Sequence, residues 1–391
     1  MDAILHTYPH FTLFCLLYGG AAVMAAILCV YLLLRKGNAI APDITPPVRL
    51  RRWAAALFGV AALGHLWWYF FFILYGDICS WTYVACVVLD CFSMLTTIFG
   101  TMLSMLQDRK RPLWPFVTAM TPIVILGGLQ IVWPATDFLT PVLVYTLAVY
   151  VFFTVYMAVA VRQYGRWLRD NYADLEHKEV WLSHTLLILL LLLVVIYEFS
   201  SDGPLLLLLR VVDFVLFGLL LWRVETLPQL EVAPTDEEDS LLEQRVSQDA
   251  DTDLQGAVTD AAGTQEADSL AQKTQVIPPN IGDLLKENCE KTGLYLMTDL
   301  TLLQLSAAVG VNRSYLSQYF STRGMNYNTY INDLRINHFV NLYQKAVAAK
   351  QSVTAQQLAL ESGYRSYSTF SNAFKLRMGQ SVLTWMHDTA E

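Results

Sequence analysis

Long apolar runs alternate with short polar connections along the first 223 residues of the chain. Seven runs are long enough to cross a bilayer as helices, which takes about 17–25 mostly apolar residues each. The runs are Phe11–Leu34, Trp53–Tyr75, Trp81–Met105, Leu113–Trp133, Pro141–Val161, Trp181–Phe199 and Pro204–Trp222. This pattern predicts a seven-helix transmembrane domain over residues 1–223, surrounded by the lipid bilayer.

Basic residues are confined to every second connection between these runs. One set of connections carries Arg35, Lys36, Arg49, Arg51, Arg52, Arg109, Lys110, Arg111, Arg162, Arg166, Arg169, Lys178 and Arg223. The other set, which is Met1–His10, "GDICS", "PATDFLT" and "SSDG", contains neither Lys nor Arg. Because basic connections stay in the cytoplasm, we expect the N-terminus outside and everything after Arg223 inside.

Four ionisable side chains lie deep inside the apolar runs: His65, Asp90, Arg210 and Asp213. An isolated charge at the bilayer centre costs at least about 2.5–3.5 kcal/mol, so we expect these groups to face one another or water. Two interpretations stay open. The four residues form a site for a proton, an unknown small molecule or another envelope signal, or Arg210 and Asp213 only hold two helices in register at i, i+3 spacing.

Residues 224–280 change composition abruptly. They contain thirteen acidic residues against two basic ones, Arg245 and Lys273, and no aromatic side chain. Such a segment has too little apolar surface to form a core. We expect a disordered acidic linker that tethers a C-terminal domain to the membrane.

The tail repeats one pattern. The stretches "TLLQLSAAVGVNRSYLSQYF" (301–320) and "TAQQLALESGYRSYSTFSNAF" (354–374) both begin with T-x-x-Q, the signature of a capping box. Gly310 and Gly363 each follow nine residues after the capping threonine, and a helix with a polar N-terminal face comes next. A short helix, a glycine turn and an exposed polar helix are typical of a helix-turn-helix motif. The repeat therefore predicts an all-helical domain with two such motifs over residues 281–391.

The tail from about Ile281 to Met386 resembles the AraC/XylS family of bacterial transcription regulators. The resemblance is carried by "NRSYLSQYF", "YINDLRINHFVNLY" and "LALESGYRSYSTFSNAFKLRMGQS". It implies two recognition helices that enter neighbouring major grooves of double-stranded promoter DNA. Because the family is bacterial, the apolar runs place the chain in the bacterial cytoplasmic (inner) membrane. The residues that it places on DNA are Asn312, Arg313, Ser314, Ser317 and Gln318 in the first helix, Arg365, Ser366, Tyr367, Thr369 and Asn372 in the second, and Lys375 and Arg377 after it. Phe339, Val382 and Trp385 depart from the family pattern at positions that concern packing.

The charge of residues 281–391 is low for a DNA-binding domain, with ten basic residues against eight acidic ones. We therefore expect a modest, salt-sensitive affinity for DNA. Confinement to the membrane raises the effective concentration of a second copy, which leaves a homodimer as a possible assembly.

Composition agrees with a membrane protein and excludes several chemistries. Hydrophobic residues make up 55% of the chain and charged residues 15%, against about 25% charged in soluble domains. The six cysteines form no CxxC pair, and no catalytic constellation is recognisable, so we expect no enzyme, no cofactor and no metal site. The sequence favours a membrane sensor that regulates transcription. The alternative is a membrane transporter or receptor whose helix-turn-helix tail serves as an interaction module.

Overall fold

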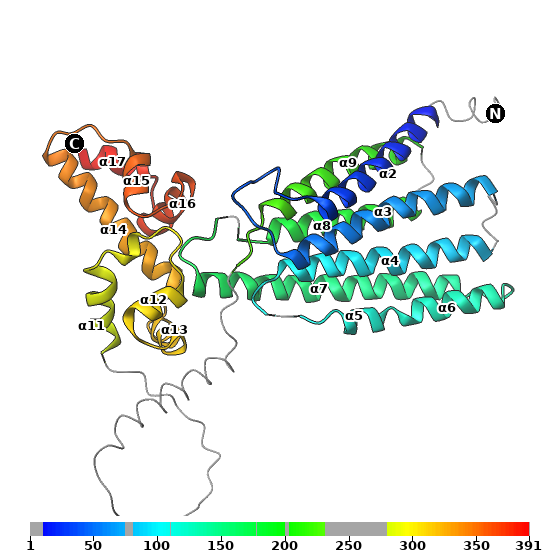
Figure 1. Cartoon of the computed structure of the whole chain (residues 1–391), viewed down its shortest axis with the longest axis horizontal. Helices are drawn as coiled ribbons and strands as arrows, with labels where there is room; N and C mark the ends of the chain where they lie inside the picture. Colours follow the sequence, from blue (N-terminus) through cyan, green and yellow to red (C-terminus); the bar gives the residue numbers. More distant parts are fainter. Residues whose placement is uncertain are drawn as a thin grey trace, which may run out of the picture. The chain divides into compact units, whose positions relative to one another are not determined.

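The computed structural model describes residues 11–74, 81–109, 111–176, 178–199, 203–230 and 280–390 (Figure 1). Within these ranges the protein is all-helical, and the one β-type pairing is an isolated bridge between Tyr172 and Thr301. The chain divides into two compact units, residues 1–168 with 176–230, and residues 169–175 with 231–391. Most of the expected acidic linker, residues 231–279, lies outside the described residues.

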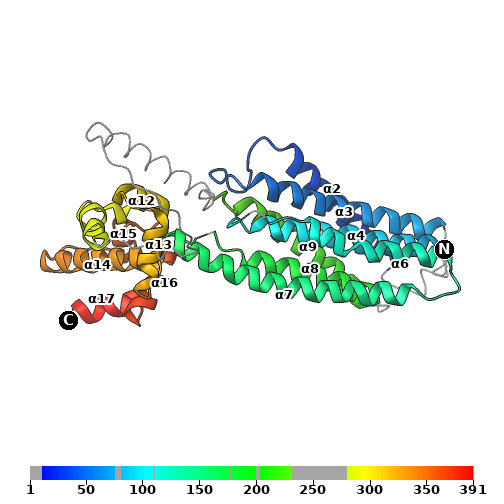
Figure 2. The same cartoon turned by 90° about the horizontal axis from the view of Figure 1, so that it is seen from below.

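The first unit is a bundle whose long helices run side by side in both views (Figures 1 and 2). Its helices are α2 (Phe11–Leu34), α3 (Val48–Leu74), α4 (Trp81–Met105), α5 (Trp114–Ala119), α6 (Thr121–Val132), α7 (Leu139–Asn171), α8 (Trp181–Phe199) and α9 (Gly203–Thr226). Helix α2 packs against α3 and α9, and α3 also packs against α4. Over its described residues, each apolar run of the sequence is therefore mainly helical.

Five helical stretches among the described residues are long and apolar enough to cross a membrane: Thr12–Leu34, Val48–Phe71, Trp81–Met105, Trp114–Val132 and Leu139–Asn171. Their outward faces carry large apolar side chains such as Leu16 and Phe152, each 68% exposed. An exposed apolar surface of this kind suits an apolar surrounding rather than water. The unit is thus compatible with a membrane protein, and α8 and α9 occupy the sixth and seventh predicted runs.

The helices do not coincide with the predicted apolar runs at every end. The fourth run, which is long enough as a whole to cross a membrane, contains two helices, α5 and α6, separated at Met120. Pro115 and Pro122 lie at the starts of these two helices, where the missing N–H of proline is tolerated. Helix α7 does not end at Val161 but continues to Asn171. Helix α9 likewise passes Trp222 and ends at Thr226.

The described part of the second unit begins, after residues 169–175, at Asn280. Its helices are α11 (Ile281–Leu285), the π-helical η1 (Lys286–Glu290), the 3₁₀ turn η2 (Leu294–Leu296), α12 (Leu302–Val309), α13 (Arg313–Thr322), α14 (Tyr327–Ala348), α15 (Ala355–Glu361), α16 (Tyr367–Met378) and α17 (Val382–Ala390). The long helix α14 contacts α13 of the first motif and both helices of the second motif. It therefore joins the two halves of the domain.

Each half has its own apolar core. The first half buries residues of α11, α12, α13 and the start of α14, together with Cys289 and Ala173. Burial raises the pKa of the Cys289 thiol to about 12, so this cysteine is a protonated core residue. The second half packs Phe339 against Phe370, Phe374 and Trp385. Two of the positions that depart from the family pattern therefore pack against each other.

Arg335 of α14 ties the halves together and was not singled out from the sequence. Its side chain is 1% exposed. The guanidinium donates to the backbone oxygens of Tyr295 (2.8 Å), Met297 (2.6 Å) and Thr298 (3.3 Å). It also lies 5.5 Å from the ring centre of Tyr364, which follows the turn glycine of the second motif. A buried charge bonded in this way fixes the loop around η2 on α14.

Candidate nucleic-acid interface and polar sites of the bundle

The first motif is formed by α12 and α13. Thr301 and Gln304 make the predicted capping box in both directions, through the bonds Gln304 N–H to Thr301 Oγ1 (3.2 Å) and Thr301 N–H to Gln304 Oε1 (2.9 Å). Gly310 ends α12 in the left-handed conformation, with φ +70°. Leu316 and Phe320 bury one side of α13. The opposite side of α13 is polar, and Ser314 and Ser317 on it are exposed.

The second motif repeats this geometry in α15 and α16, with Gly363 at φ +87°. Its predicted capping box is only half formed. Thr354 accepts from the Gln357 N–H (3.2 Å), but the Gln357 side chain bonds to Glu361 (3.0 Å). Phe370 and Phe374 bury one side of α16.

Two of the predicted DNA-binding residues are helix caps. The Asn312 side chain accepts from the Ser314 N–H (2.8 Å) at the start of α13, and Ser366 Oγ accepts from the Thr369 N–H (3.3 Å) at the start of α16. Such caps are worth about 0.5–2 kcal/mol of helix stability. The side chains of Asn312 and Ser366 therefore stabilise the starts of α13 and α16, at the surface where DNA is expected.

The other predicted residues vary in exposure. The exposed ones are Ser314, Ser317, Arg365, Asn372, Lys375 and Arg377, and the half-buried ones are Arg313, Gln318, Tyr367 and Thr369. Lys375 and Arg377 were expected after the second helix, but both lie within the last turn of α16. Two cations have carboxylate neighbours, because Arg365 lies 3.9 Å from Asp299 and Arg377 lies 2.9 Å from Asp333. Exposed pairs of this kind are weak, so they leave both arginines able to exchange partners.

Arg313, the first residue of α13, is bound by Asn171. The Asn171 side-chain oxygen accepts from Arg313 Nε (3.2 Å) and from a terminal guanidinium nitrogen (2.7 Å). Asn171 belongs to the short segment 169–175 that is part of the same compact unit as α13. This contact was not predicted, because its two residues are 142 positions apart and no local sequence pattern connects them.

Comparison with known proteins supports one part of the chain. The model of a family described as a helix-turn-helix domain, of the AraC type, matches residues 305–387. No curated protein and no solved structure matches the chain. The chain therefore carries a domain typical of DNA-binding transcription regulators. The match begins after the first turn of α12 and ends within α17.

In the bundle, three of the four ionisable residues singled out from the sequence are in contact, because His65 and Asp213 both bond to the Arg210 guanidinium. Arg210 of α9 donates to His65 Nε2 of α3 (3.1 Å) and to Asp213 Oδ2 (3.0 Å). His65 Nδ1 lies 2.6 Å from the Ala61 oxygen. Since guanidinium only donates and a carbonyl only accepts, His65 is neutral, with its proton on Nδ1. Tyr18 covers the cluster, with its hydroxyl bonded to the His65 oxygen (2.8 Å).

Asp90 of α4 has a different partner. Its carboxylate accepts from the indole N–H of Trp68 on α3, one turn along α3 from His65. The four residues are thus distributed over two linked contacts, α3 with α9 and α3 with α4. In both contacts the ionisable side chains have polar partners on a neighbouring helix.

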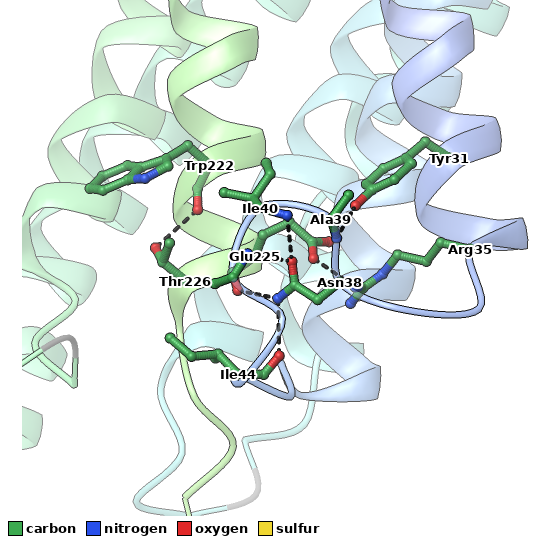
Figure 3. A network of polar contacts seen from close by, with 10 residues as sticks. Tyr31, Arg35, Asn38, Ala39, Ile40, Ile44, Trp222, Glu225 and Thr226 are labelled. Atoms are coloured by element: carbon green, nitrogen blue, oxygen red, sulfur yellow. Dashed lines mark hydrogen bonds and ion pairs between the residues drawn. The ribbon is translucent and has the colours of Figure 1, made fainter.

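A further network, not foreseen from the sequence, joins the end of α9 to the loop after α2 (Figure 3). Arg35 and Glu225 form an ion pair of 2.7 Å in which both side chains are nearly or fully buried. Asn38 Nδ2 donates to the backbone oxygens of Glu225 (2.8 Å) and Ile44 (3.0 Å). The residues that follow α9 are held as well, since the Gln229 N–H donates to the Thr45 oxygen (2.9 Å). The network fixes the chain where it leaves the bundle.

The bundle also has a cavity of about 700 Å³ between α5 and α7. Its wall is mostly aromatic and aliphatic, with two arginines among the lining residues. Residues that line it include Arg109, Arg111, Phe116, Tyr145, Phe152 and Tyr156. Arg111 is paired with Asp108 through two bonds, of 2.5 and 2.9 Å. The size falls within the range of small-molecule sites.

Proposed function

We propose that the protein is a membrane-embedded transcription regulator, which binds promoter DNA with residues 281–391 and senses a signal through its helical bundle. The observation that carries the proposal is the two helix pairs α12–α13 and α15–α16, in which the second helix has one buried apolar side and one polar side. They follow a bundle whose outward faces are apolar. The family match supports the DNA-binding part.

On DNA, α13 and α16 would enter two neighbouring major grooves. Arg313 and Arg365 suit the paired acceptors of guanine, and Gln318 and Asn372 suit adenine. Ser314, Ser317, Tyr367 and Thr369 complete the two polar faces, and Lys375 and Arg377 at the end of α16 are placed for phosphate oxygens. Because residues 281–391 are only weakly basic, two copies in one membrane would bind more strongly than one.

Replacing Arg365 by alanine tests the DNA-binding part. We expect the full chain in lipid nanodiscs to select a preferred sequence from a random duplex pool, and R365A to bind it about 5–100-fold more weakly, the value of one good arginine–guanine contact. The control K345A removes an exposed cation of α14 and should change affinity by less than about twofold. Affinity would be measured by fluorescence anisotropy. Absence of any sequence preference in the unmodified chain, at every salt concentration, would refute DNA reading.

For the bundle, we propose seven membrane crossings, with α8 and α9 as the sixth and seventh. This places the N-terminus outside and the C-terminal domain in the cytoplasm of a bacterial cell, where DNA is accessible. A reporter enzyme fused after Glu391 tests the orientation. We expect activity from a reporter that works only in the cytoplasm, because basic connections are retained there. A signal only from a periplasm-specific reporter would exclude the proposal.

The signal would act on the cluster around Arg210. Protonation of His65 Nε2 would remove the acceptor that Arg210 now uses and set two donors against each other. A proton or a small polar ligand could therefore change the contact between α3 and α9. The remaining alternative is a purely structural pair, Arg210 with Asp213, which holds α9 in place.

A second candidate ligand site is the cavity between α5 and α7. Its apolar wall and arginines suit an amphiphile with an acidic headgroup. The chain as a transporter or receptor, with the tail as an interaction module, is the competing function. That reading predicts movement of a substrate through the bundle and no selected DNA sequence.

A further inference from the structure

Residues 171–174 continue directly from the bundle helix α7 and lie in the compact unit of the DNA-binding domain. Asn171, Tyr172, Ala173 and Asp174 are all buried. Ala173 is 2% exposed and belongs to the apolar core of the first helix-turn-helix motif. This segment lies far outside residues 305–387, the part that matches the helix-turn-helix family. It is therefore an addition to the domain that this chain supplies from its own membrane half.

The segment is bound through backbone and side chains at the same time. Tyr172 forms an antiparallel bridge with Thr301, and the Ala173 N–H donates to the Leu300 oxygen (3.3 Å). Asn328 of α14 donates from its side chain to the oxygens of Tyr172 (3.2 Å) and Ala173 (2.7 Å). The segment thus pairs with the residues that start α12 and is clamped from α14. Neither Asn328 nor Asn171 is among the residues expected on DNA.

The contact with the largest consequence is Asn171 with Arg313. The Asn171 oxygen accepts from Nε and one terminal nitrogen of Arg313, which together form one edge of the guanidinium. A bidentate contact to guanine uses two such nitrogens side by side. The same edge of Arg313 cannot serve Asn171 and a base at once.

We infer that residues 171–174 hold the first recognition helix in a state that is closed to DNA, in which Asn171 takes the place of a base at Arg313. The inference rests on the proposed DNA-binding function and adds a regulatory contact to it. Since residue 171 is the last residue of α7, a signal that moves the end of this helix would release Arg313. Release raises the fraction of molecules that can bind DNA, and the apparent affinity rises in proportion.

Two substitutions weaken the contact from opposite sides. N171A frees Arg313 directly, and N328A removes two bonds to the segment without touching Arg313. We expect each variant to bind the duplex selected by the unmodified chain about tenfold more tightly, because each loses one or two bonds that favour the closed state. The matched control is N341A, an exposed asparagine on the same helix α14, for which we expect no change.

The affinities would be measured with the full chain in nanodiscs of one lipid composition, by fluorescence anisotropy. The double variant N171A/R313A separates competition from a general effect, because it should gain nothing over R313A. Unchanged or weaker binding by N171A and N328A would overturn the inference, since a merely structural segment predicts one of these two results. If neither the unmodified chain nor any of the variants binds a DNA duplex, the proposed function itself fails.

Discussion

Replacing Gly363 by alanine is expected to unfold the helix pair α15–α16. Gly363 has φ +87°, and an added Cβ would lie 2.6 Å from the Leu296 oxygen and 2.8 Å from its Cα. These are backbone atoms of η2, and Arg335 holds the carbonyls on both sides of Leu296. The neighbouring backbone therefore has no easy way to move. We expect a loss of more than about 3 kcal/mol in the stability of α15 and α16, from left-handed strain and overpacking together.

Gly310 is the matched control, because it occupies the same place in the first motif. Its φ is +70°, but an added Cβ would meet no atom within 4 Å. G310A should therefore cost only the backbone strain, about 1–2 kcal/mol. Hydrogen exchange of the amides of α12 and α16 in the full chain measures both effects. Equal losses in the two variants would show that the contact with Leu296 is not what makes Gly363 necessary.

The caps and turns of the repeated pattern were readable from the sequence because their signals are local. Each motif needs a capping threonine, a glycine turn and apolar positions at helical spacing, and all of these fall within about twenty residues. The structure confirms both threonine caps and both left-handed glycines. The predicted apolar runs are all helical for the same reason. The periodicity and composition of a segment indicate directly which of its side chains are buried.

Contacts between distant segments could not be predicted in this way. Asn171 and Arg313 are 142 positions apart, and Asn38 and Glu225 are 187 apart. A single asparagine at or after the end of a long helix has no sequence pattern that identifies its partner. The capping box predicted at the start of α15 is formed only in part, because Glu361 competes for the Gln357 side chain. Which of several nearby polar groups a side chain bonds to depends on three-dimensional packing, which cannot be read from a single sequence.

Arg35 is expected to be one of the most sensitive positions of the bundle. It forms a 2.7 Å ion pair with Glu225, whose side chain is fully buried (Figure 3). R35M would leave this carboxylate inside the protein without its main partner. Breaking a buried pair from one side costs about 3–5 kcal/mol. The loss should appear as faster hydrogen exchange at the end of α9 and in residues 38–45, because Asn38 joins the two segments.

Removing both charges distinguishes an ion pair from a general packing effect. The double variant R35M/E225M leaves no unpaired charge, so we expect it to regain most of the stability that R35M loses. R52M removes an exposed arginine of the neighbouring helix α3 and should stay within about 0.5 kcal/mol of the unmodified chain. Midpoints of thermal unfolding in detergent give the comparison for all three variants. If the double variant is as unstable as the sum of its single changes, Arg35 and Glu225 act independently, and the exit of the chain from α9 is held by Asn38 and the backbone bonds instead.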